Sequence, residues 1–428
     1  MMRVLVVGGG GREHALAWKL SCDPGVDKIF AAPGNAGIAQ IAECIPADVA
    51  DVADVARVAE SCGAELVVIG PEVPLVAGLT DDLQARGYAV FGPTAAAARI
   101  EGSKAWMKQI CAASGAPTAR AEAFTDAAAA VAFLDELSPP YVVKADGLAA
   151  GKGVVIAQDR AHAVSAVRDC LVGRAFGEAG DTVVIEEFLE GEELSLFCLT
   201  DGTTVLPLAG AQDFKRAFDG DLGPNTGGMG AYSPVPHMGD DIVERAVHEI
   251  FVPVVRQMAA EGARFRGLLY GGLMVGPQGP KALEFNCRFG DPETQVVLPR
   301  MRGDFAEILL ACAEGNLAGQ TLEWTPEACV TVVLASGGYP GDYRIGVPIR
   351  GLEAASAVPG VMVFHAGTAE RDGEIVTAGG RVLNVTALGK DIAEARARAY
   401  AAAALIEFEG KQLRGDIASR AASMEGSA

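Results

Sequence analysis

The sequence lacks the residue patterns of zinc-binding, disulfide-rich and membrane-spanning proteins. Its five histidines and nine cysteines form no C-x-x-C pair and no H-E-x-x-H motif, so no zinc site is expected. Nine cysteines cannot all pair with one another, and we expect free, mostly buried thiols in a reducing cytoplasm. No apolar run reaches membrane-spanning length, and the first apolar segment is too short for a signal peptide. We therefore predict a cytoplasmic protein.

Aromatic residues and positive charges are also scarce. Only 6% of the residues are aromatic, and 35 Lys and Arg against 55 Asp and Glu give a net charge of −20. Nucleic acids and membrane surfaces are polyanionic, so we expect neither as a partner, and an anionic substrate would need a local basic pocket. The chain has 428 residues, half of them hydrophobic, which is enough for two to four globular domains. We expect a monomer.

The first hundred residues read as a doubly wound parallel sheet. Short apolar runs alternate with helical stretches, and a glycine turn follows each run, as is typical of buried parallel strands. In such a sheet, ligands bind at the carboxyl ends of the strands. The predicted strands are residues 3–7, 28–31, 66–69 and 89–91.

The rest of the chain is predicted to form α+β and α/β units. A linking helix leads to a compact unit, which is followed by a larger α/β body and then by a C-terminal α+β part. The last residues are expected to be frayed. The predicted helices are 103–114, 161–172 and 392–408, the strands are 141–145, 154–157, 183–187, 329–335, 361–366 and 381–388, the body is 195–322 and the frayed end is 419–428.

The stretch KALEFNCRFGDPETQ, residues 281–295, carries the strongest chemical signal. Side chains alternate along a strand, so Glu284, Asn286 and Arg288 share one face. Carboxylate and amide oxygens suit a hard cation such as Mg²⁺, and a guanidinium matches carboxylate or phosphate. A solvated face with a surface ion pair is the alternative, and the acidic turn that follows favours the site. The opposite, apolar face would carry Leu283, Phe285 and Cys287.

Glycine-containing turns are expected at the ends of the first strands. Gly8–Arg12 lies between a strand and a helix, where backbone amides and the helix dipole favour an anion. It is not the dinucleotide fingerprint, because Glu13 occupies the position of the third glycine. A tight packing turn is an equal alternative, although the neighbouring arginine favours phosphate. The turns that contain Asn35 and Glu72 could line the same pocket or be plain turns.

Three further segments point to a nucleotide. In KADGLAAGKGV, Lys144 and Lys152 flank a glycine-rich loop, which could hold phosphates or be a hairpin with solvated lysines. In VVIEEFLEGEE, the backbone at 187–189 suits an adenine edge and Glu192 suits ribose hydroxyls, although acidic turns are usually just solvated. The loop GPNTGGMG, residues 223–230, could wrap a small polar ligand or have no function.

Together these stretches resemble the glycinamide ribonucleotide synthetase (phosphoribosylamine–glycine ligase) family of the ATP-grasp superfamily, over essentially the whole chain. The motifs that carry the resemblance are GGREHA, APGNAG, GPEVPL, KADGLAAGKGV, GPNTGGMGAY and RFGDPETQ. The resemblance implies an ATP-grasp fold with an N-terminal doubly wound α/β domain. The implied parts are residues 1–102 for that domain, 103–325 for the ATP-grasp region with a lid at 117–192 and a body at 193–325, and 326–428 for a C-terminal α+β domain.

The resemblance also implies a reaction, in which ATP, glycine and 5-phosphoribosylamine give glycinamide ribonucleotide, ADP and phosphate through glycyl phosphate. ATP would lie between lid and body with Mg²⁺ or Mn²⁺ on Glu284 and Asn286. Our hypothesis is that Arg288, with Asp213 and Asp291, orients glycine. The implied ATP-binding residues are Lys104, Lys144, Lys152, Glu186, Glu187, Phe188, Leu189 and Glu192, and the implied substrate-binding residues are Gly10, Gly11, Arg12, Asn35, Glu72, Asn225 and Gly228.

Two alternatives to this reading stay open. Another ATP-grasp ligase or carboxylase of purine synthesis would share the ATP residues, and a carboxylase would consume bicarbonate in place of glycine. A nucleotide-binding regulator with a degenerate site is the alternative from a different class of protein. The intact set of Glu284, Asn286 and Arg288 argues against a degenerate site.

Overall fold

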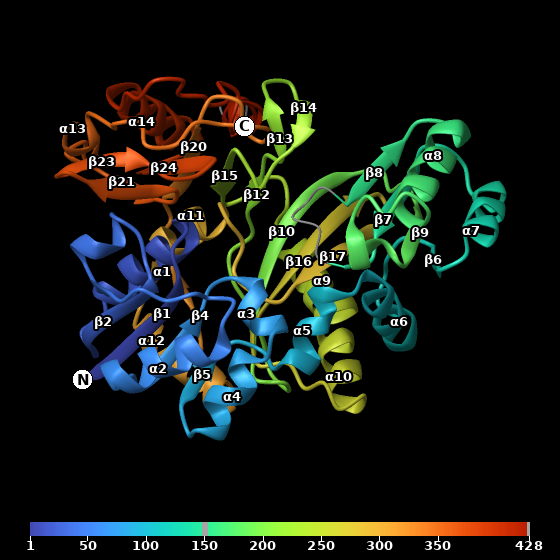
Figure 1. Cartoon of the computed structure of the whole chain (residues 1–428), viewed down its shortest axis with the longest axis horizontal. Coiled ribbons are helices and arrows are strands. Elements are labelled where there is room, and N and C mark those ends of the chain that lie inside the picture. The colour runs from blue at the N-terminus through green and yellow to red at the C-terminus, as the bar shows by residue number, and fades with distance from the viewer. Residues whose placement is uncertain (148–152, 426–428) are drawn as a thin grey trace.

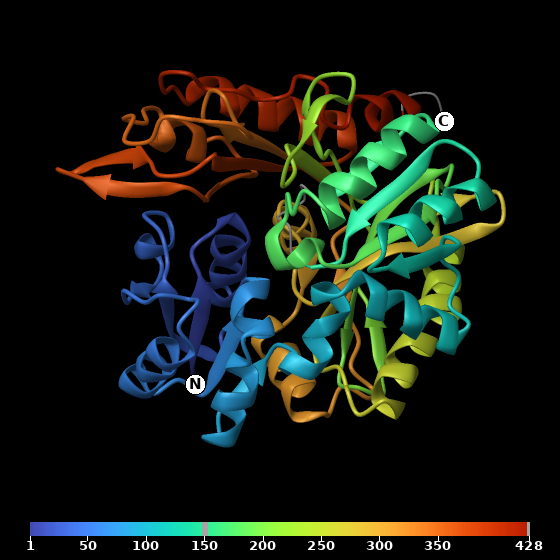
Figure 2. The same cartoon turned by 45° about the vertical axis from the view of Figure 1, so that its right-hand side comes forward.

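The computed structural model describes residues 1–147 and 153–425. The N-terminal part and the C-terminal part lie on one side of the molecule, and the lid lies on the other side (Figure 1). The body lies between them, and a turn of the view places the C-terminal sheet above the N-terminal domain (Figure 2). The site residues predicted above therefore come from parts that meet around the body.

The N-terminal domain is a five-stranded sheet with the order β3-β2-β1-β4-β5, in which all pairs are parallel. Its elements are β1 (Met2–Gly8), α1 (Gly11–Ser21), β2 (Val26–Pro33), β3 (Glu43–Cys44), α2 (Val52–Cys62), β4 (Leu66–Ile69), α3 (Glu72–Val76), α4 (Leu79–Ala85), β5 (Ala89–Phe91) and α5 (Ala95–Gly102). The strand order reverses between β1 and β4, which is where such sheets bind ligands. The turns after these two strands begin at Gly8 and Gly70.

The lid is an antiparallel sheet with the order β6-β9-β7-β8. Helix α6 (Lys104–Ser114) leads into the lid and packs against α10 (Val252–Ala260) of the body, and the elements of the lid are β6 (Ala121–Phe124), α7 (Ala127–Phe133), β7 (Tyr141–Ala145), β8 (Val154–Ala157), α8 (Arg160–Leu171) and β9 (Val183–Glu187). Helix α6 begins where the Ser103 hydroxyl accepts the Trp106 N–H at 3.1 Å, and it ends at Gly115 in the left-handed conformation with φ +74°. Phe133, Val143 and Ile185 belong to a core of the lid's own.

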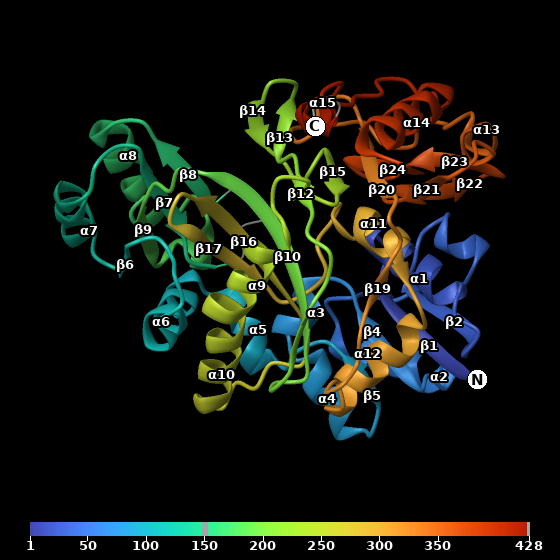
Figure 3. The same ribbon diagram turned by 180° about the vertical axis from the view of Figure 1, so that it is seen from behind.

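The body is built on an antiparallel sheet with the order β11-β10-β16-β17, and helix α10 lies against it (Figure 3). Its elements are β10 (Glu192–Thr200), β11 (Val205–Pro207), β12 (Gln212–Asp213), β13 (Arg216–Phe218), β14 (Leu222–Asn225), β15 (Gly230–Ser233), α9 (Asp240–Ala246), α10 (Val252–Ala260), β16 (Gly267–Gly276), β17 (Gly279–Asn286), α11 (Thr294–Val297), β18 (Met301–Arg302), α12 (Phe305–Glu314) and β19 (Glu323–Trp324). A π-helical turn, Val247–Phe251, joins α9 to α10.

The C-terminal sheet has the order β12-β15-β20-β24-β21 and therefore includes two strands of the body. Its remaining elements are β20 (Ala328–Ala335), α13 (Leu352–Ser356), β21 (Val361–His365), β22 (Thr368–Arg371), β23 (Glu374–Thr377), β24 (Arg381–Gly389), α14 (Ile392–Leu405) and α15 (Ser419–Glu425). The glycine loop of residues 223–230 leads directly into β15. This loop is thus held by the C-terminal sheet as well as by the body.

The prediction that residues 419–428 are frayed is wrong for the part that the structure describes. Residues Ser419–Glu425 form helix α15. Ala421 is buried at 2% exposure, and Glu425 accepts the N–H of Ile392 at 2.8 Å at the start of α14. A buried small side chain and a side-chain cap fix this short helix, although its sequence is too polar to predict an amphipathic one.

The predicted α/β class with an N-terminal doubly wound parallel sheet is confirmed. Mostly buried cysteines are also confirmed, because seven of the nine are buried. Within the described ranges, no helix combines the length and the apolar character needed to cross a membrane.

Candidate active site

Strand β17 presents the predicted oxygen-bearing face, with one irregularity. Glu284 and Asn286 are half-buried, whereas Phe285 and Cys287 of the other face are 2% and 1% exposed. The pairing with β16 skips one residue, Leu283, between Ala282 and Glu284, which is a β-bulge. The bulge leaves Leu283 half-buried rather than in the core, and it frees its carbonyl to accept from Lys144 at 3.1 Å.

Arg288 is held between two acids from outside the body. Its Nε donates to Glu72 Oε2 at 3.2 Å and its Nη2 donates to Glu101 Oε1 at 2.9 Å. The other oxygen of Glu101 accepts the N–H of Cys287 at 2.8 Å. Helix α5 is therefore joined to the end of β17 through Glu101, a residue that the sequence did not predict as part of the site.

Burial and charge oppose each other in this cluster. Burial raises the pKa of Glu101 above its ordinary value, although Arg288 acts against it. Burial also acts to raise the pKa of Glu72, but Arg288 and Arg12 lower it below the ordinary value. Burial acts to lower the pKa of Arg288, and Glu101 and Glu72 raise it instead. The guanidinium is thus charged at any working pH.

The hydrogen bonds of Arg288 decide how it can meet glycine. A guanidinium has five N–H donors. Besides its two acids, Arg288 donates through Nη1 to the Phe289 carbonyl and through Nη2 to Asn286 Oδ1, each at 3.2 Å. Among the described contacts, one donor on Nη1 stays available. The predicted contact with a carboxylate therefore has one hydrogen bond in this arrangement, not a two-pronged grip.

On the lid side, a buried acid binds two lysines. Lys144 Nζ donates to Glu186 Oε2 at 3.0 Å, and Lys108 Nζ lies 3.3 Å from the same oxygen. The other oxygen, Glu186 Oε1, is buried and has no hydrogen-bond partner among the residues that the structure describes. A buried carboxylate oxygen without a donor is costly, so this is a position for a donor from a ligand.

Lys104 faces the same region from the start of α6. Its Nζ donates to the carbonyl of Gly147 at 3.1 Å. Burial lowers the pKa of Lys104; Glu284 opposes this effect, and the neighbouring Lys144 reinforces it. The two predicted phosphate-binding lysines are therefore close enough to repel each other, with Glu284 of β17 beside them. The third, Lys152, lies outside the described residues.

The segment from lid to body holds the remaining predicted nucleotide contacts. Glu187 Oε1 accepts the N–H of Arg120 at 3.0 Å, Phe188 is exposed and Leu189 is half-buried. Glu192 starts β10 and forms ion pairs with His237 and Arg420. Phe188 and Leu189 lie between β9 and β10, outside any helix or strand. The contacts with adenine and ribose stay predictions.

The Gly8–Arg12 loop is fixed by side chains on both sides. The Gly10 N–H donates to Glu13 Oε2 at 2.6 Å, and Arg12 Nε donates to Glu13 Oε1 at 2.6 Å. Arg12 Nη1 reaches the carbonyl of Phe289 at 3.0 Å, so this buried arginine ties the loop to the end of β17. It does not face open solvent as a free phosphate clamp.

Asn35 also forms hydrogen bonds to the backbone on both sides of its loop. Its Nδ2 donates to the carbonyls of Gly9 at 2.9 Å and His365 at 2.8 Å, and its Oδ1 accepts the N–H groups of Gly37 and Ile38 at 2.9 Å each. These four bonds use the two hydrogens and the two lone pairs of the amide. Asn35 thus positions the loop, and a direct contact with sugar phosphate stays a prediction.

Two amides beside Gly11 have unmet hydrogen-bonding capacity. Both side-chain atoms of Asn384, and Oε1 of Gln295, are buried without partners among the described residues. A Cβ on Gly11 would clash with the Asn384 amide, so only glycine allows this approach. The first amides of helix α1 lie at the same place, and together these groups form a polar corner next to the predicted phosphate loop.

The acidic turn after β17 meets both glycine loops. A Cβ on Gly10 would lie 3.6 Å from Asp291 Oδ2, and one on Gly228 would clash with the ring of Pro292. Arg381 of β24 lies 3.1 Å from Asp291 Oδ2 and donates to the carbonyls of Gly227 and Asp291 at 2.6 Å each. Asn225, at the end of β14, pairs with Arg216 in the neighbouring hairpin. The C-terminal domain therefore positions Asp291.

Asp213 belongs to a buried network on the other side of this turn. Lys215 Nζ donates to Asp213 Oδ1 at 2.7 Å and to Glu193 Oε2 at 2.8 Å. Tyr270 lies opposite Asn286 in the sheet and donates to Glu293 Oε1 at 2.7 Å. Burial raises the pKa of Asp213 above its ordinary value, although Lys215 opposes this effect. The network links Asp213 to the acidic turn without placing it beside Arg288.

The donor set on β17 fits a hard divalent cation. Glu284 and Asn286 offer a carboxylate and an amide oxygen, which Mg²⁺ and Mn²⁺ accept together with water and phosphate oxygens. Within the described ranges, no group of three His, Cys, Asp or Glu side chains is placed to hold a metal. A cation here would take its remaining ligands from a phosphate and from water.

Sequence reasoning missed three residues of the site: Glu101, Lys108 and Arg381. Lys108 follows Lys104 by four residues on helix α6, so the two share a face, and this spacing could have revealed it. Glu101 lies in an Ala-rich helix without a motif. Arg381 follows two glycines, which is a weak signal by itself.

Comparison with protein-family models places three matches along the chain. Residues 2–101 match the N domain of phosphoribosylglycinamide synthetase, residues 102–294 match its ATP-grasp (A) domain, and residues 329–420 match its C domain. These ranges follow the predicted parts in order, and the predicted boundaries themselves stay predictions.

Curated relatives match over the full length. Phosphoribosylamine–glycine ligase of Rhizobium meliloti is 52% identical over 424 residues, which cover 99% of this chain and 100% of that protein. The protein of the same name from Escherichia coli (strain K12) is 51% identical over 428 residues, with 99% and 100% covered. The Streptomyces coelicolor protein of this name is 53% identical over 424 residues, with 98% and 100% covered.

Solved structures agree. The crystal structure of phosphoribosylamine–glycine ligase from Thermotoga maritima has a TM-score of 0.86 at 35% identity and covers 97% of this chain and 100% of its own. The biotin carboxylase domain of 2-oxoglutarate carboxylase from Hydrogenobacter thermophilus has a TM-score of 0.74 at 17% identity, with 96% and 92% covered, which shows the shared ATP-grasp fold alone. The predicted fold and the family resemblance are thereby confirmed, and the chain belongs to the phosphoribosylglycinamide synthetase family.

Proposed function

We propose that the protein, as a cytoplasmic monomer, joins glycine to 5-phosphoribosylamine in de novo purine biosynthesis. The reaction consumes ATP and gives glycinamide ribonucleotide, ADP and phosphate. The relatives that carry the name phosphoribosylamine–glycine ligase support the proposal, because they match this chain from end to end.

The observation that carries the proposal is that β17 connects a cluster rich in lysines to a cluster of acids around an arginine. At Glu284 the strand lies beside Lys104 and the lid lysines, which suits the phosphates of a nucleotide. Just beyond its end, Arg288 lies among Glu72 and Glu101, which suits an amino acid with a carboxylate and an ammonium group. A ligase must hold a nucleotide and a zwitterion side by side, and this strand does so.

The nucleotide side provides charge neutralisation. Lys104 and Lys144 would face the phosphates, and Glu284 and Asn286 would hold Mg²⁺ or Mn²⁺, which would neutralise the charge that develops on the transferred phosphoryl group. The carboxylase of the same fold is described with MgADP, which supports Mg²⁺ as the cation. Glu186 accepts a hydrogen bond through its unpartnered oxygen, and residues 187–189 align the adenine edge.

The glycine side provides orientation. The free Nη1 donor of Arg288 meets the glycine carboxylate, and Asp291, with Asp213 behind the turn, provides the negative charge for the ammonium group. The carboxylate then attacks the γ-phosphorus of ATP and forms glycyl phosphate, with ADP leaving. Holding two reactants in line in this way can contribute about 7–11 kcal/mol to lowering the barrier.

The sugar phosphate occupies the corner between the N-terminal and C-terminal domains. The amide of Gly11 and the unpartnered amide of Asn384 bind its phosphate, and Arg12 and Asn35 position the loop. Glu72 and the loop with Asn225 and Gly228 border the ribose. The amine of 5-phosphoribosylamine then attacks the acyl carbon of glycyl phosphate and displaces phosphate.

The test follows ADP release with glycine and 5-phosphoribosylamine added separately and together, the latter generated in the assay because it is labile. Full turnover should need both substrates. ADP release with bicarbonate and an aminoimidazole nucleotide, but not with glycine, would identify a carboxylase instead. AMP in place of ADP would contradict the acyl phosphate route, and no nucleotide turnover with any substrate would favour a regulator.

A further inference from the structure

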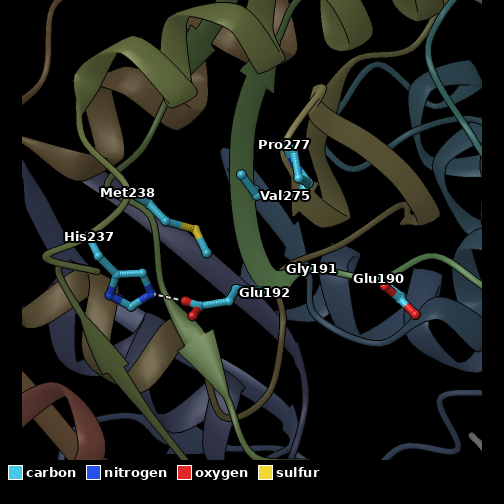
Figure 4. A pocket seen from close by; sticks show the side chains of 8 residues that line it. Glu190, Gly191, Glu192, His237, Met238, Val275 and Pro277 are labelled. Atoms are coloured by element: carbon cyan, nitrogen blue, oxygen red, sulfur yellow. Dashed lines mark ion pairs between the residues drawn. The ribbon is translucent and has the colours of Figure 1, made fainter.

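Strand β10 begins with polar side chains on both of its faces. Glu192 lies on the face that packs on helix α10, and Figure 4 shows it paired with His237 beside a pocket. Ser195 lies on the opposite face, because it pairs with Gly272 and thus stands in one row with Glu284 across the sheet. A buried hydroxyl therefore points into the face that carries the predicted metal ligands.

Tyr270 of β16 adds a second buried hydroxyl to this face. The Oγ atom of Ser195 and the hydroxyl oxygen of Tyr270 are 2.9 Å apart, and Tyr270 donates to Glu293 Oε1 at 2.7 Å. The ring of Tyr270 lies edge-on against the ring of Phe197, with centroids 4.9 Å apart. At the other end, Ser195 Oγ lies 3.5 Å from Asp213 Oδ1. The two hydroxyls thus connect the acid of the turn after β17 with the acid of β12.

The chain from Glu293 to Asp213 has a direction. Its four oxygen atoms are separated by three gaps, but the two hydroxyls supply only two hydrogens. An ionised Glu293 can only accept, so Tyr270 donates to it and Ser195 donates to Tyr270. The missing hydrogen falls at the longest gap, the 3.5 Å between Ser195 and Asp213. Both hydrogens therefore point towards Glu293, and Asp213 is held by Lys215, which donates to it at 2.7 Å.

Glu293 lies between the two groups of the predicted glycine site. Burial and nearer partners have larger effects, but Glu293 also raises the pKa of Arg288 and that of Asp213, so its charge reaches both groups. A Cβ on Gly290 would lie 2.6 Å from Glu293 Oε2, so this oxygen faces the backbone two residues beyond Arg288. Among the described side chains, Tyr270 is the hydrogen-bond partner of Glu293, and it reaches only Oε1. The Oε2 atom is thus left for a donor from a ligand.

We propose that Glu293 binds the ammonium group of glycine through Oε2, and that Tyr270 and Ser195 are positioning residues that hold the Glu293 carboxylate for this contact. The glycine carboxylate meets Arg288, so the two charges of the zwitterion are bound by two residues of one turn. The inference rests on the proposed function in placing glycine beside Arg288. It adds a second acid to Asp291 on the ammonium side.

The two hydroxyls should differ in weight. Without the Tyr270 hydroxyl, the buried carboxylate of Glu293 loses its donor, which is costly, and it turns to find another one. Its Oε2 atom then loses the orientation towards the substrate. Ser195 acts one step further away, because its hydrogen only fixes the direction of the Tyr270 hydroxyl. The effect of Ser195 on glycine should therefore be smaller, and it should depend on Tyr270.

The test measures KM for glycine, KM for ATP and kcat in Tyr270→Phe and Ser195→Ala. Tyr270→Phe keeps the ring and its packing on Phe197 and removes only the hydroxyl. We expect KM for glycine to rise about tenfold in Tyr270→Phe and about threefold in Ser195→Ala, with KM for ATP and kcat at saturating glycine within about twofold. The double variant should show about a tenfold rise, not about thirtyfold, because the Ser195 hydroxyl acts only through Tyr270.

Conservative and distant variants separate positioning from simple loss of structure. Ser195→Thr keeps the hydroxyl, so its KM for glycine should stay within about twofold of that of the unmodified protein. Tyr400→Phe is the matched control, because Tyr400 also makes two hydrogen bonds, to the carbonyl of Arg414 at 2.6 Å and from the N–H of Ile417 at 3.1 Å, within the C-terminal domain. It should leave KM for glycine unchanged. Thermal unfolding of each variant checks that the chain is folded.

A second measurement does not depend on turnover. Glycine is titrated against thermal unfolding of the full chain with MgADP present, and the half-maximal glycine concentration should rise in the variants by the same factors. An unchanged response to glycine in Tyr270→Phe, equal rises in KM for glycine and for ATP, or independent effects in the double variant would overturn the inference. If the proposed function alone fails, ligase turnover is missing while glycine still stabilises the protein and the variants still differ. No stabilisation by glycine in the unmodified protein would overturn both.

Discussion

Two seams of the molecule differ in the balance of their charges. At the N-terminal seam, where residues 8–101 meet the end of β17, the cations Arg12 and Arg288 lie among the acids Glu13, Glu72 and Glu101. At the lid seam, where α6 and β7 meet β17, three lysines share the acids Glu186 and Glu284. The first seam thus has one acid in excess, whereas at the second Asp146 also acts on Lys104, so that three lysines face three acids.

The difference indicates how one strand can serve two kinds of ligand. At the N-terminal seam, the charged groups find one another within the protein, and the neutral Asn384 amide and the Oε1 atom of Gln295 lack partners among the described residues. At the lid seam, the Oε1 atom of Glu186 has no hydrogen-bond partner among the described residues. The three lysines suit a triphosphate, and the excess acid of the N-terminal seam suits substrates with an amino group.

The largest effect is expected from removing the cation at the centre of the N-terminal seam. Arg288→Ala leaves Glu72 and Glu101 without their counter-charge, and breaking such a buried pair costs about 3–5 kcal/mol. We expect a fall of about 3 kcal/mol in the free energy of unfolding in urea and at least about a hundredfold loss of glycine-dependent turnover, with ATP still bound. Unchanged glycine affinity and rate would rule out the role of Arg288.

A smaller effect is expected from acid where α1 of the N-terminal domain meets β21 of the C-terminal domain. His14 Nδ1 accepts the N–H of His365 at 2.8 Å, so its ring is neutral there. Burial, with a contribution from His365, lowers the pKa of His14 from 6.5 to about 3, and burial lowers that of His365 to about 4. Because the unfolded chain takes up these protons near pH 6.5, stability is complete above that pH and is lost as the pH falls towards 4.

At pH 5, this linkage should lower the free energy of unfolding by about 2 kcal/mol for each histidine relative to pH 7.5. Urea unfolding at both pH values measures it. His14→Asn retains an acceptor near Nδ1 without a titrating ring, so about half of the acid sensitivity should disappear. An equal pH dependence in this variant would contradict the lowered pKa of His14.

At the lid seam, a neutral amide in place of the bridging acid should weaken nucleotide binding. In Glu186→Gln, Lys144 and Lys108 lose their shared counter-charge and repel each other more strongly. We expect ATP to bind about tenfold more weakly in calorimetry, while the stability of the N-terminal seam is unaffected. Glu122→Gln, at an exposed position of the lid sheet, is the control. Equal effects of both changes would contradict the role of Glu186.

The smallest effect is expected where the C-terminal domain positions Asp291. Arg381→Ala removes two hydrogen bonds to backbone carbonyls and one ion pair, and Arg381→Lys cannot make all three at once. We expect kcat to fall about threefold to tenfold in the alanine variant and less in the lysine variant, with KM for ATP unchanged. Arg350→Ala, an exposed site of the same domain, is the control. A change in KM for ATP alone would contradict the assignment.

Local sequence patterns predicted much of the fold. Strands Leu66–Ile69, Tyr141–Ala145 and Val183–Glu187 have the predicted bounds, because each is a short apolar run bounded by turn residues. The short strands β12, β13 and β14 were not predicted, because segments of two to four mostly polar residues are too short to show a hydrophobic periodicity. The predicted helix 392–408 ends at Leu405, where the chain turns into an isolated bridge with Arg350.

The site shows the same division between local and distant information. Alternation along one strand placed Glu284, Asn286 and Arg288 together, because side chains repeat every two residues. The partners of Arg288 lie 216 and 187 residues away, so no local pattern links them. The bulge at Leu283 depends on the register with β16, which only the pairing of two strands defines.

The sharing of β12 and β15 between the body and the C-terminal sheet limits how this protein can be rearranged. A hybrid that exchanged only residues 326–428 with a distant relative would have to rebuild the seam between β15 and β20. A mismatch there would disturb core residues of both strands, such as Tyr232 and Val330, and also the loop at Gly228 and the turn at Asp291. The C-terminal domain is therefore not an interchangeable module, and a transplant should include residues 212–233.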